Sequence, residues 1–355
     1  MESLLSVADY ERLAEERLEP GPWAYLAGGS GDEWTLRENR AAFERWTFRP
    51  RVLCDVSQVS TATAVLGTPI ELPVVVAPVA YQELYDPDGE CATARGAAAA
   101  GTGMAVSTFT CRSHEEIAAA APGLMQWCQL YVFQDRGVTR EHLAGAAAAG
   151  CSAVVLTVDT PLLAQRERDV RVGFEIPAEL PLPYARGAIG VEAQNPADQF
   201  ALLDASVSWR DLEWIASEGR LPVILKGVVT AEDARTAVEH GAAAVVVSNH
   251  GGRQLDGVPA TLDSLPEVAA AIDGGAEVYL DGGIRRGTDV AKALALGARA
   301  VLAGRAPVFG LATAGEDGVR RVLELLRDEL AMTLALLGCN SPDQLTSAHV
   351  RRSPS

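Results

Sequence analysis

The stretch PVILKGVVTAEDARTAVEHGAAAVVVSNH, residues 222–250, contains two short apolar runs separated by a helix-like segment. The runs, Pro222–Val228 and Ala244–His250, are rich in β-branched residues, which is typical of strands buried on both faces. Between them, Thr230 precedes an acidic first turn and Gly241 follows the last turn, so a capped helix is predicted there. The stretch therefore predicts a β–α–β unit with parallel strands.

The same pattern recurs along the chain and gives eight apolar runs in all. Most successive runs are spaced as a crossover helix requires, but a much longer segment separates the fourth run from the fifth. Eight alternating strand and helix units favour a closed (β/α)8 barrel over an open Rossmann sheet. The six other runs are Val74–Ala80, Met104–Phe109, Met125–Phe133, Ala153–Asp159, Val278–Gly283 and Ala300–Arg305.

The rest of the chain is predicted to form additions to this barrel within a single domain. A length of 355 residues allows one domain or two, but only one set of barrel units is present. The long segment after the fourth run is rich in Pro, Gly and polar residues, which predicts a mobile lid over the active site. The predicted parts are an N-terminal helical extension (1–70), the barrel (71–315) with its lid (about 171–208), a C-terminal helix (316–340) and a tail (341–355).

Composition excludes several classes of partner. With 47 acidic and 30 basic residues the formal charge is −17, which repels nucleic acid and anionic membrane surfaces. The six cysteines form no CxxC pair, so we expect neither a metal site nor a disulfide framework. Neither a signal peptide nor a membrane-spanning apolar stretch is evident, so a cytoplasmic protein is expected.

Polar residues stand at almost every strand end, which is where barrel enzymes carry their chemistry. A purely structural barrel would not place charged side chains on otherwise apolar strands, because an unpaired buried charge is costly. These residues therefore predict an active site. In chain order they are Ala80, Ser107, Gln129 with Tyr131, Thr157 with Asp159, Lys226, His250, Asp281 with Gly283, and Gly304 with Arg305.

The segments LDGGIRRGTDV (280–290) and LAGRAPV (302–308) place glycines and arginines at the ends of the last two strands. Barrel enzymes commonly bind a phosphate at this position through backbone N–H groups and a helix N-terminus. Arg285 and Arg305 can add charge-assisted hydrogen bonds. Glycine is also ordinary turn punctuation, so the location rather than the glycines indicates a phosphorylated ligand.

The segment SNHGGRQLDG, residues 248–257, carries the most specific local signal. His250 at a strand end can act as a general base near neutral pH, and Arg253 can bind a carboxylate with its planar guanidinium. Asp159 could hold the imidazole. A single histidine is often only a structural residue, but its setting between Asn249, two glycines and Arg253 favours a functional role.

Six segments together resemble the FMN-dependent family that oxidises 2-hydroxy acids, which includes glycolate oxidase, lactate oxidase and mandelate dehydrogenase. The resemblance spans about residues 5–340. The segment APVAYQELYDPDGE (77–90) is most similar to bacterial hydroxymandelate oxidases. The six segments are SNHGGRQLDG, LPVILKGVVTAEDA, LTVDTP, QLYVFQDR, LDGGIRRGTDVAKALALGA and the N-terminal GGSGDEWTLRENRAAF.

The resemblance implies roles for the residues that match the family's motifs. His250 would be the catalytic base, with Asp159 as its partner and Lys226 beside the N1 and O2 side of the flavin. The substrate would contact Tyr25, Phe109, Tyr131, Arg166 and Arg253, and the Tyr131 hydroxyl would also assist catalysis. The residues implied to bind FMN are Ala80, Ser107, Gln129, Thr157, Lys226, Ser248, Asp281, Gly283, Arg285, Gly304 and Arg305.

The reaction implied is oxidation of an (S)-2-hydroxy acid to the 2-oxo acid, with oxygen as the acceptor and a homotetramer as the assembly. Phe109 and Tyr81, with Leu162 and Leu163 as apolar neighbours, favour an aryl substrate or one larger than glycolate. The alternatives are a dehydrogenase with another acceptor, a lactate- or glycolate-type oxidase, and more remotely a non-redox FMN- or phosphate-binding barrel or a non-catalytic flavin-binding protein. Transfer of hydride and formation of a carbanion both remain open.

Overall fold

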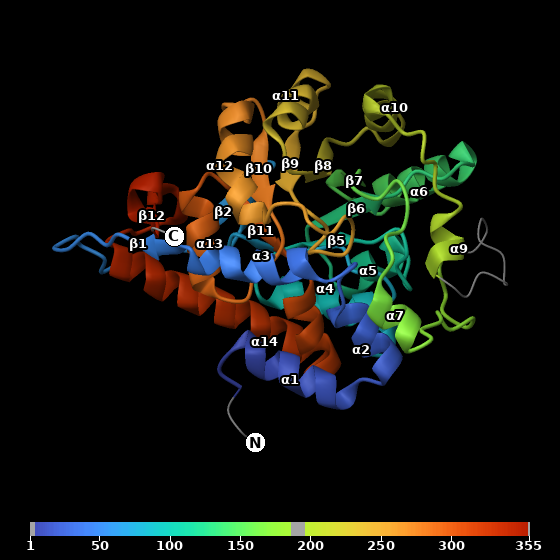
Figure 1. Ribbon diagram of the computed structural model, residues 1–355, viewed down its shortest axis with the longest axis horizontal. Coiled ribbons are helices and arrows are strands. Elements are labelled where there is room, and N and C mark those ends of the chain that lie inside the picture. The colour runs from blue at the N-terminus through green and yellow to red at the C-terminus, as the bar shows by residue number, and fades with distance from the viewer. Residues whose placement is uncertain (1–3, 186–195, 354–355) are drawn as a thin grey trace.

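The computed structural model describes residues 4–185 and 196–353 and contains a closed barrel of eight parallel strands (Figure 1). Each strand pairs with the next in the chain, and the last pairs with the first, which closes the barrel. This confirms the predicted (β/α)8 fold. The strands are β4 (Val74–Val76), β5 (Met104–Val106), β6 (Gln126–Leu130), β7 (Ala153–Thr157), β8 (Val223–Val228), β9 (Ala244–Val247), β10 (Glu277–Leu280) and β11 (Ala300–Ala303).

The barrel interior is a packed apolar core. Alternate residues of each strand point inward, and Trp127 and Tyr279 stack there with ring centroids 5.6 Å apart. The other strand residues contact the surrounding helices, which is why the runs are apolar throughout. Because the interior is filled, a ligand can bind only at the open ends of the barrel.

Eight helices among the described residues follow the eight strands. The helix predicted between Thr230 and Gly241 is present, and the Thr230 hydroxyl accepts a hydrogen bond from the backbone N–H of Asp233 at its start. The helices are α4 (Gly89–Ala99), α5 (His114–Ala120), α6 (Arg136–Ala148), α10 (Trp209–Gly219), α11 (Ala231–Glu239), α12 (Thr261–Ile272), α13 (Gly287–Ala295) and α14 (Arg305–Leu337).

The C-terminal region differs from its prediction in two ways. The predicted terminal helix is the second part of α14, which is continuous with the last barrel helix except for a break at Ala314 and Gly315. The predicted tail contains two 3-10 turns, η2 (Pro342–Gln344) and η3 (Ser347–His349), and strand β12 (Val350–Arg352). Strand β12 pairs antiparallel with β1 (Trp46–Phe48), so the tail is anchored to the N-terminal part of the chain.

The N-terminal extension is helical only in its first part. Helices α1 (Val7–Arg17), α2 (Pro20–Ala27) and α3 (Trp34–Glu44) are followed by β1 and by the hairpin of β2 (Thr63–Val65) and β3 (Thr68–Ile70). Helix α1 packs against α14, and α3 packs against α12. This packing places the end of α2 at the carboxyl end of the barrel. The division into parts of a single domain stays a prediction.

The segment predicted as a mobile lid is largely packed where the structure describes it. It follows α7 (Glu167–Arg171) and includes α9 (Pro196–Phe200), while residues 186–195 lie outside the described residues. Ile176, Leu180 and Leu182 are buried, and they join Phe200 in an apolar cluster with the 3-10 turn η1 (Gln82–Leu84) at its edge. The described parts of the lid thus form a wall of the barrel mouth. No helix in residues 4–185 or 196–353 is long and apolar enough to span a membrane.

Candidate active site

A cavity of about 130 Å³ opens at the carboxyl end of the barrel, where the sequence places the active site. Nearly all of the predicted site residues line it. Asp159 and Ser248 are the two that do not, but each is hydrogen-bonded to a residue that does. The predicted residues lining the cavity are Tyr25, Ala80, Ser107, Phe109, Gln129, Tyr131, Thr157, Arg166, Lys226, His250, Arg253, Asp281, Gly283, Arg285, Gly304 and Arg305.

His250 and Asp159 form a hydrogen-bonded pair at the ends of β9 and β7. The Nδ1 atom of His250 lies 2.9 Å from a carboxylate oxygen of Asp159. The hydroxyl of Thr160 donates to the same carboxylate oxygen at 3.0 Å and lies 3.3 Å from Nδ1. The carboxylate therefore holds the proton on Nδ1, which leaves the Nε2 lone pair of a neutral imidazole available to the cavity.

The backbone around His250 is strained in a way that aims the imidazole. His250 has a φ of 58°, in the left-handed region that only glycine adopts readily, and Gly251 and Gly252 follow with φ of 63° and 75°. A Cβ on Gly252 would overlap the backbone of Leu36. Left-handed backbone in a non-glycine residue is concentrated at functional sites. Gly251 and Gly252 are thus required by the turn that presents His250.

Electrostatics favour a neutral His250 beside a charged Asp159. Burial lowers the pKa of His250 below its usual 6.5 and outweighs the opposing attraction of Asp159. Burial alone would raise the pKa of Asp159, but the charges of His250 and Lys226 outweigh it and lower that pKa. The pair can accept a proton on the imidazole near pH 7, and the carboxylate would stabilise the imidazolium formed.

Lys226 provides a buried positive charge on the floor of the cavity. Its Nζ atom lies 3.0 Å from the Asp281 carboxylate and donates to the Ser248 hydroxyl at 3.0 Å. Burial opposes the charge, but Asp281 and Asp159 raise the pKa of Lys226, so the ammonium stays protonated. One oxygen of Asp281, Oδ1, is buried and has no hydrogen-bond partner among the described residues. A ligand donor would satisfy it.

Polar side chains on β5, β6 and β7 continue the floor. The Gln129 amide donates to the Thr157 hydroxyl at 3.1 Å and accepts from the backbone N–H of Thr108 at 3.0 Å. The Ser107 hydroxyl accepts from the backbone N–H of Phe109. These bonds fix a row of hydrogen-bonding groups that continues to Lys226, the register neighbour of Thr157 on β8, which suits a planar heterocycle with several donors and acceptors.

Two arginines that form no ion pair within the described residues flank the cavity. Arg166 is 5% exposed, and its guanidinium and that of Arg253 lie over the Tyr25 ring, 5.7 Å and 4.8 Å from its centroid. Arg253 donates to the backbone carbonyls of Tyr25 and Gly28, and neither arginine forms an ion pair within the described residues. Burial and the neighbouring charge of Arg253 lower the pKa of Arg166. The arrangement favours binding of an anion.

The ends of β10 and β11 form a second cationic region. Arg305 donates only to backbone carbonyls, those of Leu26, Gly28 and Gly251, and burial with the nearby charges of Arg253 and Arg285 lowers its pKa. Helix α14 begins at this residue without a side-chain cap, so its first N–H groups are open. A phosphate here would meet two guanidinium groups and a helix N-terminus.

Gly283 and Gly304 differ in what they require. Gly283 has a φ of 84°, and a Cβ there would collide with the backbone of Asn39, so the close approach of α3 demands glycine. At Gly304 a Cβ would meet only ordinary contacts. The protein's own packing therefore does not require glycine at position 304, and only a ligand in the cavity would.

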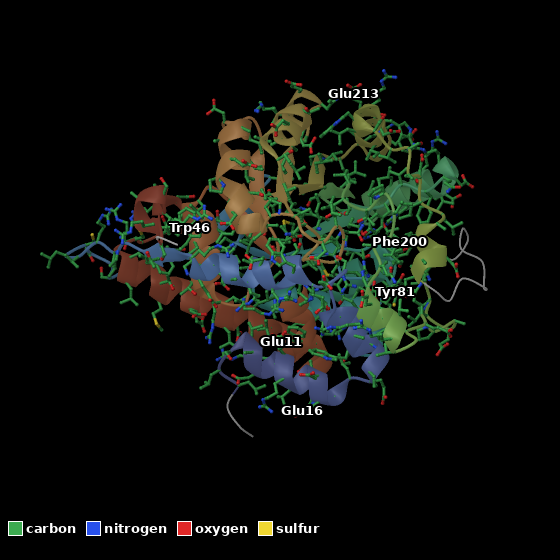
Figure 2. The ribbon with its side chains drawn as sticks, viewed as in Figure 1. Glu11, Glu16, Trp46, Tyr81, Phe200 and Glu213 are labelled. Carbon is green, nitrogen blue, oxygen red and sulfur yellow. The ribbon has the colours of Figure 1, made fainter. Side chains whose placement is uncertain are left out.

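Aromatic side chains form the outer wall of the cavity. Phe109 lies 5.7 Å from Tyr131 and 5.3 Å from Phe200 between ring centroids. Tyr81 is completely buried behind them, and its hydroxyl donates to Gln199 at 2.6 Å. Figure 2 shows Tyr81 and Phe200 on the side of the barrel where α9 lies. Tyr81 supports the wall rather than lining the cavity.

Several residues of the site, among them Phe200 and Thr160, were not predicted from the sequence, and Tyr81 and Leu162 do not line the cavity as expected. Phe200 lines the cavity and Thr160 contacts the His250–Asp159 pair, but neither was predicted. Leu162, expected as an apolar neighbour of the substrate, is 73% exposed, whereas Leu163 packs against the aromatic wall. In the sequence, Phe200 is marked only as an isolated aromatic residue in a polar stretch, and Thr160 only as a hydroxyl residue next to Asp159.

A protein-family model described as FMN-dependent dehydrogenase matches residues 14–352. The chain belongs to this family. Among its curated relatives, glycolate oxidase 3 of Arabidopsis thaliana is 48% identical over 98% of this chain and 96% of the relative. The L-lactate oxidase of a Nostoc species is 50% identical over 95% of each chain. As a member of the FMN-dependent dehydrogenase family, the protein is an FMN-dependent oxidoreductase.

Solved structures support the same assignment. The crystal structure of a mandelate oxidase with (S)-4-hydroxymandelic acid has a TM-score of 0.93 to this FMN-dependent dehydrogenase, at 43% identity over 98% of both chains. The structure of the same kind of enzyme with (S)-2-phenylpropionate has a TM-score of 0.88 at 43% identity. The architecture is thus shared along the whole chain.

The cavity of this family member fits FMN. The open helix N-terminus and Arg305, which forms no ion pair among the described residues, suit the phosphate. The Oδ1 atom of Asp281, unpartnered among the same residues, suits a hydroxyl of the ribityl chain. Gln129, Thr157 and the neighbouring Lys226 suit the polar edge of the ring system. FMN leaves the His250 and Arg166 side of the cavity for a substrate.

Proposed function

We propose that the protein oxidises an (S)-2-hydroxy acid to the corresponding 2-oxo acid. The observation that carries this proposal is the juxtaposition of a neutral, carboxylate-held His250 with Arg166 and Arg253, which form no ion pair in the part of the chain that the structure describes. A 2-hydroxy acid presents both a carboxylate and an adjacent C–H and O–H. The relatives that are named for glycolate, lactate and mandelate support the same substrate class.

In this proposal, different side chains bind the substrate, position it and accept its proton. Bound FMN supplies the electron acceptor. Arg166 and Arg253 bind the substrate carboxylate, and the hydroxyls of Tyr25 and Tyr131 position the substrate beside it. His250 accepts a proton at Nε2, while Asp159 fixes the ring and stabilises its charged form. Because the carboxylate is fixed relative to the base, only one enantiomer presents its α-carbon correctly.

The remaining predicted residues are proposed to hold the cofactor. Lys226, kept charged by Asp281, would stabilise negative charge on the ring system. Ala80 provides a small side chain beside the ring, and Ser248 orients Lys226. The other proposed FMN contacts are Ser107, Gln129, Thr157, Asp281, Gly283, Arg285, Gly304 and Arg305.

The substrate is proposed to be aryl, as in mandelate, or otherwise larger than glycolate. Phe109, Tyr131 and Phe200 provide an aromatic wall next to the arginines, and stacking against an aryl ring would stabilise binding. The mandelate oxidase structure with (S)-4-hydroxymandelic acid supports this choice and the S configuration.

An anaerobic reduction experiment tests this function. The purified protein should be yellow, and (S)-mandelate should bleach it faster than glycolate, lactate or (R)-mandelate. Readmitted oxygen should restore the colour if oxygen is the acceptor, as we propose. Yellow protein that no 2-hydroxy acid bleaches would refute the function. Slow return of colour in oxygen, with fast return on addition of a quinone or a dye, would instead identify a dehydrogenase.

The pH dependence of kcat/KM should report the base. Because the pKa of His250 lies below its usual 6.5, protonation of the imidazole should remove activity only in acid. We expect kcat/KM to rise with pH through an apparent pKa below 6.5 and to be constant around pH 7. A rise centred above pH 7 would show that another group is the base.

Replacement of Phe200 by leucine should reduce selectivity for aryl substrates. An aromatic pair contributes about 0.5–1.5 kcal/mol beyond its buried area, so kcat/KM for mandelate should fall about two- to tenfold. The value for glycolate, which has no ring, should change little. Phe133→Leu is the matched control, since Phe133 belongs to the same aromatic cluster but does not line the cavity. Equal losses in both variants would mean that the cluster acts only through stability.

We also propose a homotetramer in the cytoplasm. The side chains of Val52 and Leu53 are 82% and 103% exposed, which suits burial against another copy of the chain. All six cysteines are free thiols, as in proteins of reducing compartments. Sedimentation analysis tests the first point, because a monomer at micromolar concentration would contradict it. Fractionation of the source cells tests the second.

A further inference from the structure

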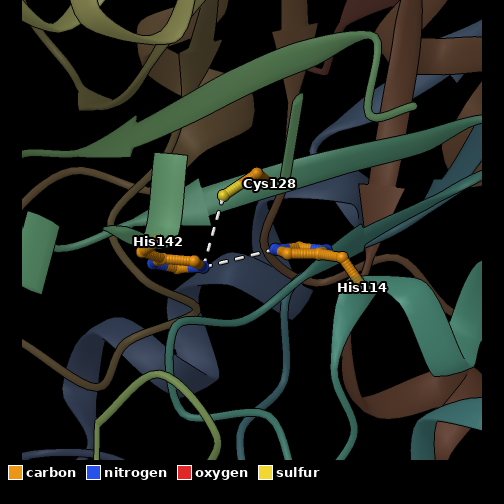
Figure 3. Close-up of side chains that lie close together, drawn as sticks. All are labelled: His114, Cys128 and His142. Atoms are coloured by element: carbon orange, nitrogen blue, oxygen red, sulfur yellow. Dashed lines mark hydrogen bonds between the residues drawn. The ribbon is translucent and has the colours of Figure 1, made fainter. Parts of the chain in front are cut away.

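A buried cluster of His114, Cys128 and His142 lies outside the barrel, away from the proposed active site. Cys128 is in β6, His142 is in α6, and His114 is the first residue of α5 (Figure 3). The three side chains are 0–1% exposed. Nothing in the proposed reaction uses these side chains, and their burial in an apolar layer needs an explanation because two are polar heterocycles.

Two of the three distances between the ligand atoms are close to those of a metal site. The Nε2 atoms of His114 and His142 are 3.2 Å apart, and the Sγ atom of Cys128 lies 3.4 Å from the Nε2 of His142. All three atoms lie within 4.8 Å of one another. Metal–nitrogen and metal–sulfur bonds of about 2.0 and 2.3 Å put the ligands of one ion about 3.3–3.8 Å apart. Only small side-chain shifts are needed to admit an ion.

A second layer of contacts orients the two imidazoles. The Nδ1 atom of His114 lies 3.5 Å from the Sγ atom of Cys151, on the side of the ring opposite Nε2. The ring of Tyr184 stacks on His142 with centroids 4.3 Å apart, and its hydroxyl accepts from the backbone N–H of His114. Outer contacts of this kind fix the orientation of metal-binding histidines.

We propose that His114, Cys128 and His142 form a buried site for a thiophilic d10 metal ion, and that the ion is Cu⁺. Thiolate and imidazole ligands select copper and zinc, and a trigonal set of two histidines and one cysteine suits copper. Binding replaces the thiol proton by a Cu–S bond and releases that proton to solvent. Two neutral imidazoles, one thiolate and Cu⁺ sum to zero charge.

Charge balance favours Cu⁺ over Zn²⁺. No carboxylate of residues 4–185 or 196–353 forms a hydrogen bond or ion pair with any of the three ligands. A divalent ion would therefore leave a net positive charge in an apolar layer, which is costly. The ion would tie α5 and α6 to β6. Cys128 and Gln129 point to opposite faces of β6, so turnover should change little.

The test is an anaerobic titration of the flavin-loaded enzyme with Cu⁺ in competition with bicinchoninate. All variants carry Cys54→Ser, because Cys54 is exposed and could bind copper at the surface. We expect one Cu⁺ per chain and an X-ray absorption spectrum with two nitrogen neighbours and one sulfur. Cys128→Ser and His142→Gln should each weaken binding by more than about 100-fold, since even outer contacts are worth about 10–100-fold.

Two further variants separate a metal site from a merely structural cluster. Cys151→Ala removes an outer contact and should weaken Cu⁺ binding about 10–100-fold while one ion per chain still binds. Cys91→Ser alters a half-buried thiol elsewhere and should leave binding unchanged. Failure of the Cys54→Ser parent enzyme to retain copper would refute the site. So would a Cu⁺ affinity equal to that of the parent in Cys128→Ser and His142→Gln variants that fold and bind flavin. Retention of Zn²⁺ but not Cu⁺ would refute the choice of ion.

Discussion

Replacing His250 by asparagine is expected to lower kcat for the best 2-hydroxy acid by about 100- to 10,000-fold, the usual contribution of a general base. Asparagine cannot accept the proton, but it tolerates the left-handed backbone that His250 adopts at a φ of 58°. Alanine would add backbone strain and confuse the result. The measurement is the anaerobic rate of flavin bleaching under saturating substrate.

The flavin colour and a matched surface variant serve as controls for His250→Asn. His250→Asn should stay yellow, because most of the proposed FMN contacts come from other strand ends. His240→Asn is a matched surface control, since His240 stacks on Trp209 and lies outside the cavity. Bleaching by His250→Asn at more than a tenth of the original rate would remove His250 from the role of base.

Replacing Lys226 by methionine should destabilise the protein by about 3–5 kcal/mol, because it leaves the Asp281 carboxylate buried without its partner. Lys226 and Asp281 are 4% and 6% exposed, and their charged atoms lie 3.0 Å apart. The remaining carboxylate would also repel a negatively charged cofactor. We therefore expect weaker FMN retention and a lower urea midpoint at pH 7.

The double variant Lys226→Met with Asp281→Asn distinguishes the two effects. Removing both charges should recover most of the lost stability, because no unpaired ion remains. Turnover should stay low, since no cation would remain beside the ring system. A double variant that is no more stable than Lys226→Met alone would show that the ion pair is not the source of the loss.

The barrel and most of the candidate site could be predicted because both depend on local sequence. The β-branched runs are buried on both faces, so each strand is visible as an apolar stretch, and the residue that ends it is visible as a polar exception. Lys226 and His250 stand out for this reason. The helix caps at Thr230 and Gly241 are local as well.

The features that sequence did not predict depend on contacts between distant segments. Strands β1 and β12 have three residues each, which is too short for periodicity, and they meet from opposite ends of the chain. Phe200 reaches the cavity because η1 and the turn after β5 provide an apolar surface for α9. The adjacent Leu162 and Leu163 are chemically equal in sequence, and only the fold turns one inward and the other outward.

The hydrogen bonds of Arg305 to the carbonyls of Leu26 and Gly28 join residues 279 and 277 positions apart. Strand β4 likewise needs β11 to close the barrel. During synthesis, the N-terminal residues of the cavity wall therefore cannot make these contacts until the last strand has been added. Contacts between such distant residues slow folding. We therefore expect a nascent chain to lack the complete proposed FMN pocket until Arg305 has been added, so that FMN binds only after nearly the whole protein has been made.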